Sequence, residues 1–221
     1  MKKILLIGIV LLLTGCQGNT DINTEYDNYQ LNVTGQINGG CKNIDKEDSW
    51  GDIHQYNYLL DYKNNLEEYK NSIWIGYTDN DKQYISNDHG NTYSRVENTL
   101  YNVFDNNYRE KVKELLAYIN ASKKKKIKVK KGIKTFQVNF KDNLEDAFNI
   151  VTDLGVVGKY EKIDEMDTTV TLDKDNNITK IEFNITCKPA DKNIAKNCYK
   201  LTWIFSNHNK IKIELPNNVS N

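Results

Sequence analysis

The sequence has few of the residue patterns that build catalytic or metal-binding sites. Its three histidines, His54, His89 and His208, lie far apart and show no zinc-ligand spacing such as H-x₃-H or C-x₂-C. No serine lies in a G-x-S-x-G motif, and no phosphate-binding G-x-x-x-x-G-K is present; one S-x-x-K spacing, Ser122 to Lys125, falls in a run of lysines. We therefore predict no catalytic residues, no metal, no cofactor and no enzymatic activity.

The sequence also lacks an excess of positive or negative charge. Lys and Arg total 30, Asp and Glu total 30, and the formal net charge is +0. Because general nucleic-acid binding depends on neutralising phosphates, we expect no nucleic-acid partner. The strongest basic run is KKKKIKVKK, residues 123–131. Two interpretations stay open: a solvated strand face that deters edge pairing, or contact with anionic lipid headgroups. The lysines proposed for that membrane-surface contact are Lys123, Lys124, Lys125 and Lys126.

The sequence lacks a hydrophobic run long enough to cross a bilayer. Its N-terminal apolar run, Ile4–Leu13, has about half of the ~20 residues that a spanning helix needs. Lys2 and Lys3 precede it, which is typical of a signal peptide. The run ends in LTGC, residues 13–16, which resembles the lipobox of bacterial lipoproteins. The alternative is an uncleaved anchor with an incidental cysteine.

The lipobox resemblance implies that the thiol of Cys16 carries a diacylglycerol and begins the mature chain. Residues 1–15 would then be a lipoprotein signal peptide, residues 16–28 the lipidated cysteine and a polar tether, and residues 29–221 the folded domain. The protein is then expected to be lipid-anchored at the extracytoplasmic face of the cell membrane. Acyl chains would replace the apolar segment as the anchor.

Cysteine is scarce, and the number that remains outside the anchor is odd. Cys41, Cys187 and Cys198 are left when Cys16 is set aside. Cys187 and Cys198 flank a loop between two predicted strands, so a disulfide across that hairpin is geometrically reasonable. Three separate thiols are the alternative, because an exported location permits disulfides without requiring them.

Alternation of apolar and polar residues predicts strands over most of the chain. Two segments have helical periodicity instead, with apolar residues on one face. The expected helices are 106–126 and 143–155. The expected strands are 28–37, 54–62, 72–86 (with a turn at 78–81), 90–96, 126–132, 133–140, 168–176, 177–187, 198–207 and 210–216. Blocks of strands with inserted helices indicate an α+β fold, a curved antiparallel sheet (half-barrel) with helices covering the concave face.

Two stretches resemble a known group of lipoproteins. KQYISNDHGNTYSRV, residues 82–96, resembles a hairpin of lipoproteins with a LolA/LppX-like fold. TVTLDKDNNITKIEFNI and LTWIFSNHNKIKIELPNNV resemble the last strands of that fold, in particular in the DUF6612-like Gram-positive lipoproteins. The resemblance implies an incomplete barrel around a hydrophobic cavity plugged by helices, which carries lipoproteins, lipids or lipid-like ligands.

We therefore expect a non-enzymatic, membrane-anchored lipoprotein that binds a hydrophobic or lipidic ligand. The alternative is a cell-surface protein that binds another envelope protein and has no ligand cavity. An exposed apolar patch would favour that alternative. The candidate cavity residues are the inward apolar positions of the predicted strands: Leu31, Val33, Trp74, Tyr84, Phe136, Val138, Phe183, Trp203 and Phe205.

Overall fold

A computed structural model defines the architecture of the chain. The structure describes residues 22–79, 82–96, 108–140, 142–154, 162–188, 195–217 and 219–220. Cys16 and the predicted signal peptide lie outside the described residues.

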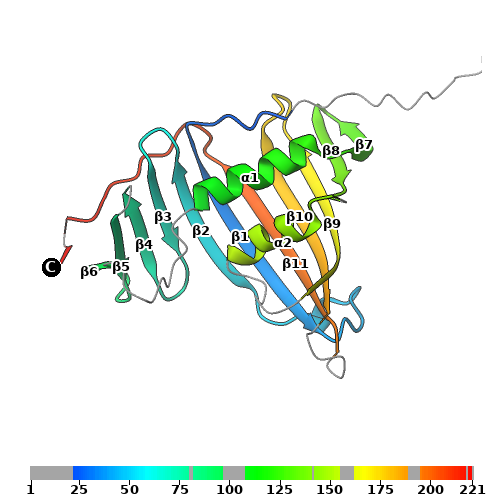
Figure 1. Ribbon diagram of the computed structural model, residues 1–221, viewed down its shortest axis with the longest axis horizontal. Coiled ribbons are helices and arrows are strands. Elements are labelled where there is room, and N and C mark those ends of the chain that lie inside the picture. The colour runs from blue at the N-terminus through cyan, green and yellow to red at the C-terminus, as the bar shows by residue number, and fades with distance from the viewer. Residues whose placement is uncertain are drawn as a thin grey trace, which may run out of the picture.

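A single open sheet forms the body of the protein (Figure 1). Its strand order is β12-β6-β5-β4-β3-β2-β1-β11-β10-β9-β8-β7. All pairings are antiparallel except that of the short β12 with β6. The bounds are β1 Asn28–Gly39, β2 His54–Asp61, β3 Leu66–Lys70, β4 Ile75–Asp79, β5 Lys82–Ser86, β6 Tyr93–Val96, β7 Lys124–Lys130, β8 Ile133–Val138, β9 Lys162–Leu172, β10 Ile178–Lys188, β11 Asn197–Ser206 and β12 Val219–Ser220.

Strand β1 joins the N-terminal and C-terminal halves of the sheet at its centre. Its odd-numbered residues Tyr29, Leu31 and Val33 are at most 1% exposed, as the period of two requires. They face one side, whereas the intervening polar side chains face the other. Leu31 lies opposite Phe205 of β11, so the first and last long strands share one apolar layer. These cross-strand pairs stabilise the centre of the sheet.

Two helices pack on the same face of the sheet (Figure 1), α1 (Tyr108–Ala121) and α2 (Leu144–Asp153). In α1 the buried residues Val112, Leu115, Leu116 and Ile119 form one apolar stripe at helical spacing. They join the apolar strand residues in one continuous hydrophobic core. The predicted α+β class, with helices against one face of an antiparallel sheet, is confirmed. We call the other face of the sheet the open face.

Strand β3 was missed because its sequence, LEEYK, contains two glutamates. Glu67 is nevertheless only 2% exposed, because Arg109 at the start of α1 pairs with it. The Arg109 side chain and backbone N–H both donate to Glu67 Oε1, at 2.8 and 3.0 Å. Burial raises the pKa of Glu67, and the contacts with Arg109 offset part of that rise.

The strand predicted over residues 210–216 is wrong. KIKIELP alternates in sequence, but residues 211–216 form no strand and, of these, only Ile213 is buried. Strand β11 already has β1 and β10 on its two sides, so it offers no free edge for another strand. The chain crosses the end of β1 instead, where Asn209 N–H and Ile211 N–H donate to the backbone and side chain of Asn28.

Part of the predicted tether is folded. Ile22 and Tyr26 are buried in the core, although residues 16–28 were assigned to the tether. Asn23 forms a bridge with Asn177, and the Tyr26 hydroxyl donates to Asn23 O at 2.6 Å. Tyr26 Oη also accepts the N–H of Ile178. Short polar stretches carry no apolar periodicity, so this docking could not be predicted from the sequence.

Candidate functional site: a disulfide-held loop at one end of the sheet

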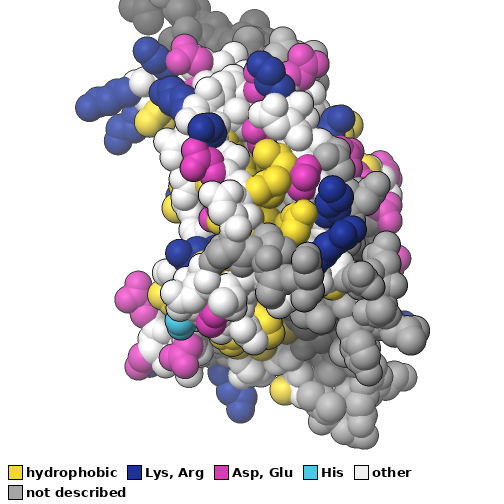
Figure 2. All heavy atoms as spheres, turned by 90° about the vertical axis from the view of Figure 1, so that its left-hand side faces the viewer, with side chains coloured by type: hydrophobic (Ala, Val, Ile, Leu, Met, Phe, Trp, Pro, Cys, Tyr) yellow, Lys and Arg dark blue, Asp and Glu magenta, His cyan; other side chains and the backbone are white. Residues whose placement is uncertain are grey.

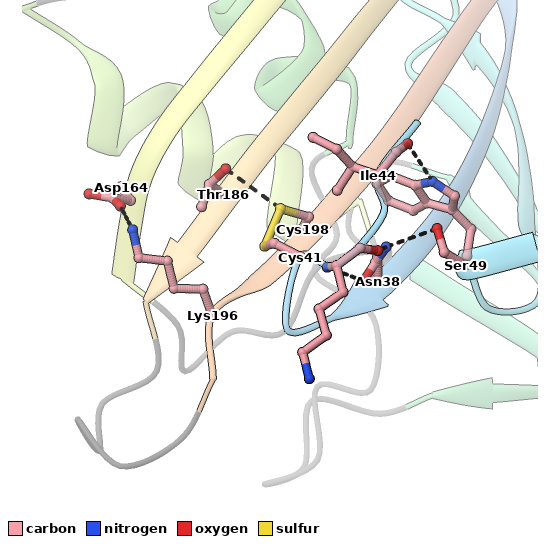
Figure 3. Close-up of a disulfide and its surroundings, with 10 residues drawn as sticks. Asn38, Cys41, Ile44, Ser49, Asp164, Thr186, Lys196 and Cys198 are labelled. Carbon is pink, nitrogen blue, oxygen red and sulfur yellow. Dashed lines mark hydrogen bonds and ion pairs between the residues drawn. A yellow bond between two sulfur atoms is a disulfide. The ribbon is translucent and has the colours of Figure 1, made fainter. Parts of the chain in front are cut away.

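The loop between β1 and β2, residues 40–53, is folded by a buried asparagine. Asn38 is 2% exposed, and its side-chain amide donates to Lys42 O at 2.8 Å and to Ser49 Oγ at 3.2 Å. Its Oδ1 accepts the N–H of Lys42. The single hydroxyl proton of Ser49 is shared between Asn43 O and Lys46 O, each of which lies 2.7 Å from Ser49 Oγ. The loop is therefore organised around Asn38 (Figure 3).

A disulfide fastens this loop to the sheet. Cys41 is bonded to Cys198 at the start of β11, with the two Cα atoms 5.1 Å apart (Figure 3). The two cysteines are separated by 157 positions in the sequence. A link of this span restricts the unfolded chain strongly, which is how a disulfide stabilises a fold in the chain-entropy account.

The predicted Cys187–Cys198 disulfide is wrong, because the two side chains point to opposite faces of the sheet. Cys187 lies opposite Asn197 in the β10–β11 register, and Cys198 lies opposite Thr186. Cys187 shares the buried, helix-covered face with Ile185. It is a buried cysteine outside the disulfide. Cys198 faces the open side, where Cys41 reaches it.

Ion pairs hold the neighbouring strand ends. Asp164 of β9 pairs with Lys188 of β10 and with Lys196, whose Nζ lies 2.5 Å from Asp164 Oδ2. Hydrogen bonds from these two lysines hold the pKa of Asp164 below its ordinary value. The pairs are solvent-exposed, so they order this end more than they stabilise the whole fold.

A groove lies between the disulfide-held loop and the open face, with a volume of about 420 Å³. Two rows of cross-strand neighbours form its floor, because antiparallel register places Asp167, Asn184 and Lys200 side by side. Glu165, Thr186 and Cys198 form the next row. The full lining is Ile44, Asp45, Trp50, Glu165, Asp167, Asn184, Ile185, Thr186, Cys198, Tyr199 and Lys200.

Trp50 and Lys200 make one wall of this groove. Lys200 Nζ lies 4.2 Å from the Trp50 ring centroid, a cation–π contact, and also donates to Ile44 O. The Trp50 indole N–H donates to the same carbonyl at 3.1 Å. With the carboxylates of the floor, this arrangement offers acceptors, one cation and an apolar edge. Such a mixed lining offers both hydrogen-bonding and apolar contacts to a bound group.

Exposed isoleucines gather at the same end of the molecule. Ile53 and Ile73 are each 59% exposed and line a second groove of about 450 Å³ together with Tyr56. Ile44 is 45% exposed and lies on the loop. Ile37 lies beside the loop, since Gly51 N–H donates to Ile37 O at 2.9 Å. We call this region, residues 37–53 and 70–73, the loop end.

Most of the candidate cavity residues lie in the hydrophobic core of the described part of the chain. Seven of them are at most 5% exposed and belong to the core between sheet and helices. In particular, Trp203 packs edge-on against Phe183 with ring centroids 5.3 Å apart. These seven are Leu31, Val33, Phe136, Val138, Phe183, Trp203 and Phe205. The sheet and helices therefore bring them together as a packed core.

The other two candidates, Trp74 and Tyr84, lie toward the β6 side. Trp74 is partly buried against the core. Tyr84 lines a cleft with Tyr69 and Tyr108 of only about 20 Å³, room for about one water molecule. Burial raises the pKa of Tyr69 to about 12. The view toward this edge (Figure 2) shows a small group of hydrophobic side chains at the surface among side chains of both charges.

The basic run predicted for membrane contact joins α1 to β7. Lys124 donates to Asn120 O at 2.9 Å and so caps the end of α1. Lys125 and Lys126 are exposed, and Lys126 has a φ of 52° within an irregular stretch of the β7–β8 ladder. Strand β7 is an edge strand, as the structural interpretation of the lysines expects.

His208 differs from the solvated turn residue that its position suggests. Its ring lies 4.5 Å from that of Tyr26, and its Nε2 is buried without a hydrogen-bond partner among the described residues. Burial lowers the pKa of His208. Within the described ranges, no group of three or more His, Cys, Asp or Glu residues is arranged to hold a metal ion.

Comparison of the sequence with family models and with curated proteins found no match. The described part of the chain forms a large open antiparallel sheet with two helices. None of the helices in the described part of the chain is long and apolar enough to cross a membrane.

Proposed function

We propose that this protein is a non-enzymatic, membrane-anchored binding protein of the cell envelope, and that its loop end binds another envelope protein. The observation that carries the proposal is the disulfide-held loop. It holds exposed isoleucines beside a groove that has a mixed polar and apolar lining. Ordering a loop before binding lowers the entropic cost of association.

An extracytoplasmic location supports the proposal. The Cys41–Cys198 disulfide is typical of proteins in oxidising compartments. The lipobox-like LTGC sequence would supply the anchor through a diacylglyceryl group on Cys16. We propose that the domain has a LolA/LppX-like fold. An open sheet with helices on one face agrees with it at the level of architecture.

An internal lipid or other hydrophobic ligand is the second proposal, and the geometry favours it less. A ligand between sheet and helices would have to displace α1 or α2 from residues such as Leu31 and Trp203, which have no exposed surface. Interiors are close-packed, and separating these layers would expose a large apolar area to water. A protein partner at the loop end requires no such opening.

Site-specific photo-crosslinking in the producing cells tests the proposal. A photoreactive residue at Ile53 or Ile73 of the full chain is expected to give one discrete covalent product with another envelope protein. Ile204, which is 44% exposed on the open face, is the control position and is expected to give none. The same product from Ile204, or no product from any position, would count against a binding surface at the loop end.

A further inference from the structure

We propose that the end of the molecule opposite to the loop end docks on an anionic lipid bilayer. This surface comprises residues 22–23, 128–134 and 173–177, and we call it the hairpin end. The inference rests on the proposed anchor at Cys16 and adds the orientation of the domain on the membrane. It concerns different residues from the partner-binding surface.

Three segments that are distant in the sequence meet at the hairpin end. Lys134 of β8 donates to Asn176 Oδ1 in the β9–β10 turn at 2.6 Å. A Cβ on Gly132, in the β7–β8 turn, would lie 3.3 Å from Cβ of Lys174. Asn23 donates from its backbone to Asn176 O at 3.1 Å, and from its side chain to Asn177 Oδ1 at 3.0 Å. The start of the folded chain therefore lies beside the β7–β8 hairpin (Figure 1).

The folded chain starts very close to the proposed anchor. Six residue steps separate Cys16 from Ile22, which is already buried in the core. At about 3.6 Å per fully extended residue, this stretch spans at most roughly 22 Å. An acyl chain on Cys16 would hold the hairpin end within that distance of the headgroups. The loop end lies at the other end of β1, a strand of 12 residues that spans about 40 Å.

The charge of the hairpin end complements an anionic surface. Residues 128–134 contain Lys128, Lys130, Lys131 and Lys134 and no acidic residue, and Lys174 lies in the adjacent β9–β10 turn. Lys128, Lys130 and Lys131 are exposed and have no carboxylate partner among the described residues. The adjacent turn contributes Asp173 and Asp175, and Asp173 accepts hydrogen bonds from within that turn. The formal charge of the hairpin end is therefore positive.

Two exposed aliphatic side chains at the tip favour a bilayer over bulk water as the neighbour. Val129 is 64% exposed and Ile133 is 50% exposed. Val129 lies opposite Lys134, and Ile133 lies opposite Lys130, so each apolar side chain has a lysine beside it. Protection of a sheet edge explains lysines along β7 but not these apolar residues. Lysines combined with aliphatic residues are typical of segments that sit in the headgroup region.

Lysine footprinting of the full acylated chain in vesicles tests the orientation. Acetylation rates are measured by mass spectrometry in phosphatidylcholine vesicles with and without phosphatidylglycerol. We expect Lys128, Lys130 and Lys131 to react several-fold more slowly when phosphatidylglycerol is present. Lys42, Lys46 and Lys70 are the control lysines, since they are exposed at the loop end, away from the hairpin end. Their rates are expected to stay unchanged.

The same samples separate failure of the orientation from failure of the anchor. The mass of the peptide containing Cys16 reports acylation, and an unmodified Cys16 would overturn the anchor and this inference together. If Cys16 is acylated but phosphatidylglycerol changes the acetylation rates of both sets of lysines equally, or slows only the control lysines, the orientation alone would be overturned.

A matched pair of triple variants completes the test. K128Q/K130Q/K131Q is expected to abolish the protection of Lys125 and Lys126 by phosphatidylglycerol, whereas K42Q/K46Q/K70Q leaves it intact. Both variants remove three exposed positive charges, and equal unfolding midpoints would establish that both are folded. Full protection of Lys125 and Lys126 in the first variant would contradict docking through the hairpin.

Discussion

The pairing of the cysteines depends on which face of a strand each one occupies. Cys187 has the same parity in the sequence as the apolar Phe183 and Ile185, so it belongs to the core. Cys198 has the parity of Lys200, so it belongs to the open face. That signal was present in the sequence. The return of Cys41 to β11 was not, because it depends on a loop folded around Asn38.

Removing the Cys41–Cys198 disulfide is predicted to destabilise the fold. Disulfides that close long loops contribute about 2–5 kcal/mol to the free energy of unfolding. Reductant should therefore lower the urea midpoint of the native protein. C41S/C198S should start lower and show no response to reductant. C187A serves as the control and should still respond. Loss of the response in C187A would mean that Cys187 forms the bond.

Stability is predicted to depend on pH through His208. Because burial holds its folded pKa below the ordinary 6.5, the unfolded chain binds a proton first as the pH falls. The free energy of unfolding should therefore decrease as the pH drops through 6.5 toward the lower folded pKa. His208→Gln should remove this part of the pH dependence of the free energy of unfolding. Urea titrations at pH 7.5 and 5.5 measure it, and an identical pH response in both proteins would contradict the prediction.

At the scale of elements, the local alternation of apolar and polar residues predicted most strands. The two segments that it misassigned depend on an ion-pair partner in one case and on the lack of a free sheet edge in the other. LEEYK lacks an apolar alternation, and it forms β3 because Arg109 neutralises Glu67 in the interior. KIKIELP has the alternation, and it forms no strand because β11 has no free edge. Both differences arise from contacts with residues that are remote in the sequence, which periodicity cannot report.

Neighbouring residues of β11 should differ sharply in their contribution to stability. Trp203 has no exposed surface and packs against Phe183, whereas Ile204 is 44% exposed on the open face. Trp203→Ala should lower the free energy of unfolding by about 3–5 kcal/mol, because it leaves a cavity in the core. Ile204→Ala should change it by no more than about 0.5 kcal/mol. Similar urea midpoints for the two variants would contradict a packed interior.

At the scale of the whole molecule, the two ends of the sheet carry different surfaces. The disulfide-held loop and the exposed isoleucines lie at one end, and the lysine hairpin lies beside the start of the folded chain at the other. The α+β class was predictable because it follows from the succession of local periods. Neither surface was predictable as a unit, because each one assembles segments that only the sheet topology brings together.

The most direct test of a protein partner against an internal ligand is native mass spectrometry of the full chain, extracted from the producing membranes in mild detergent. The account predicts the mass of one acylated chain plus one protein partner, with no additional lipid retained in the chain itself. A stoichiometric lipid adduct that survives detergent exchange and is released by organic solvent, without any protein partner, would contradict it.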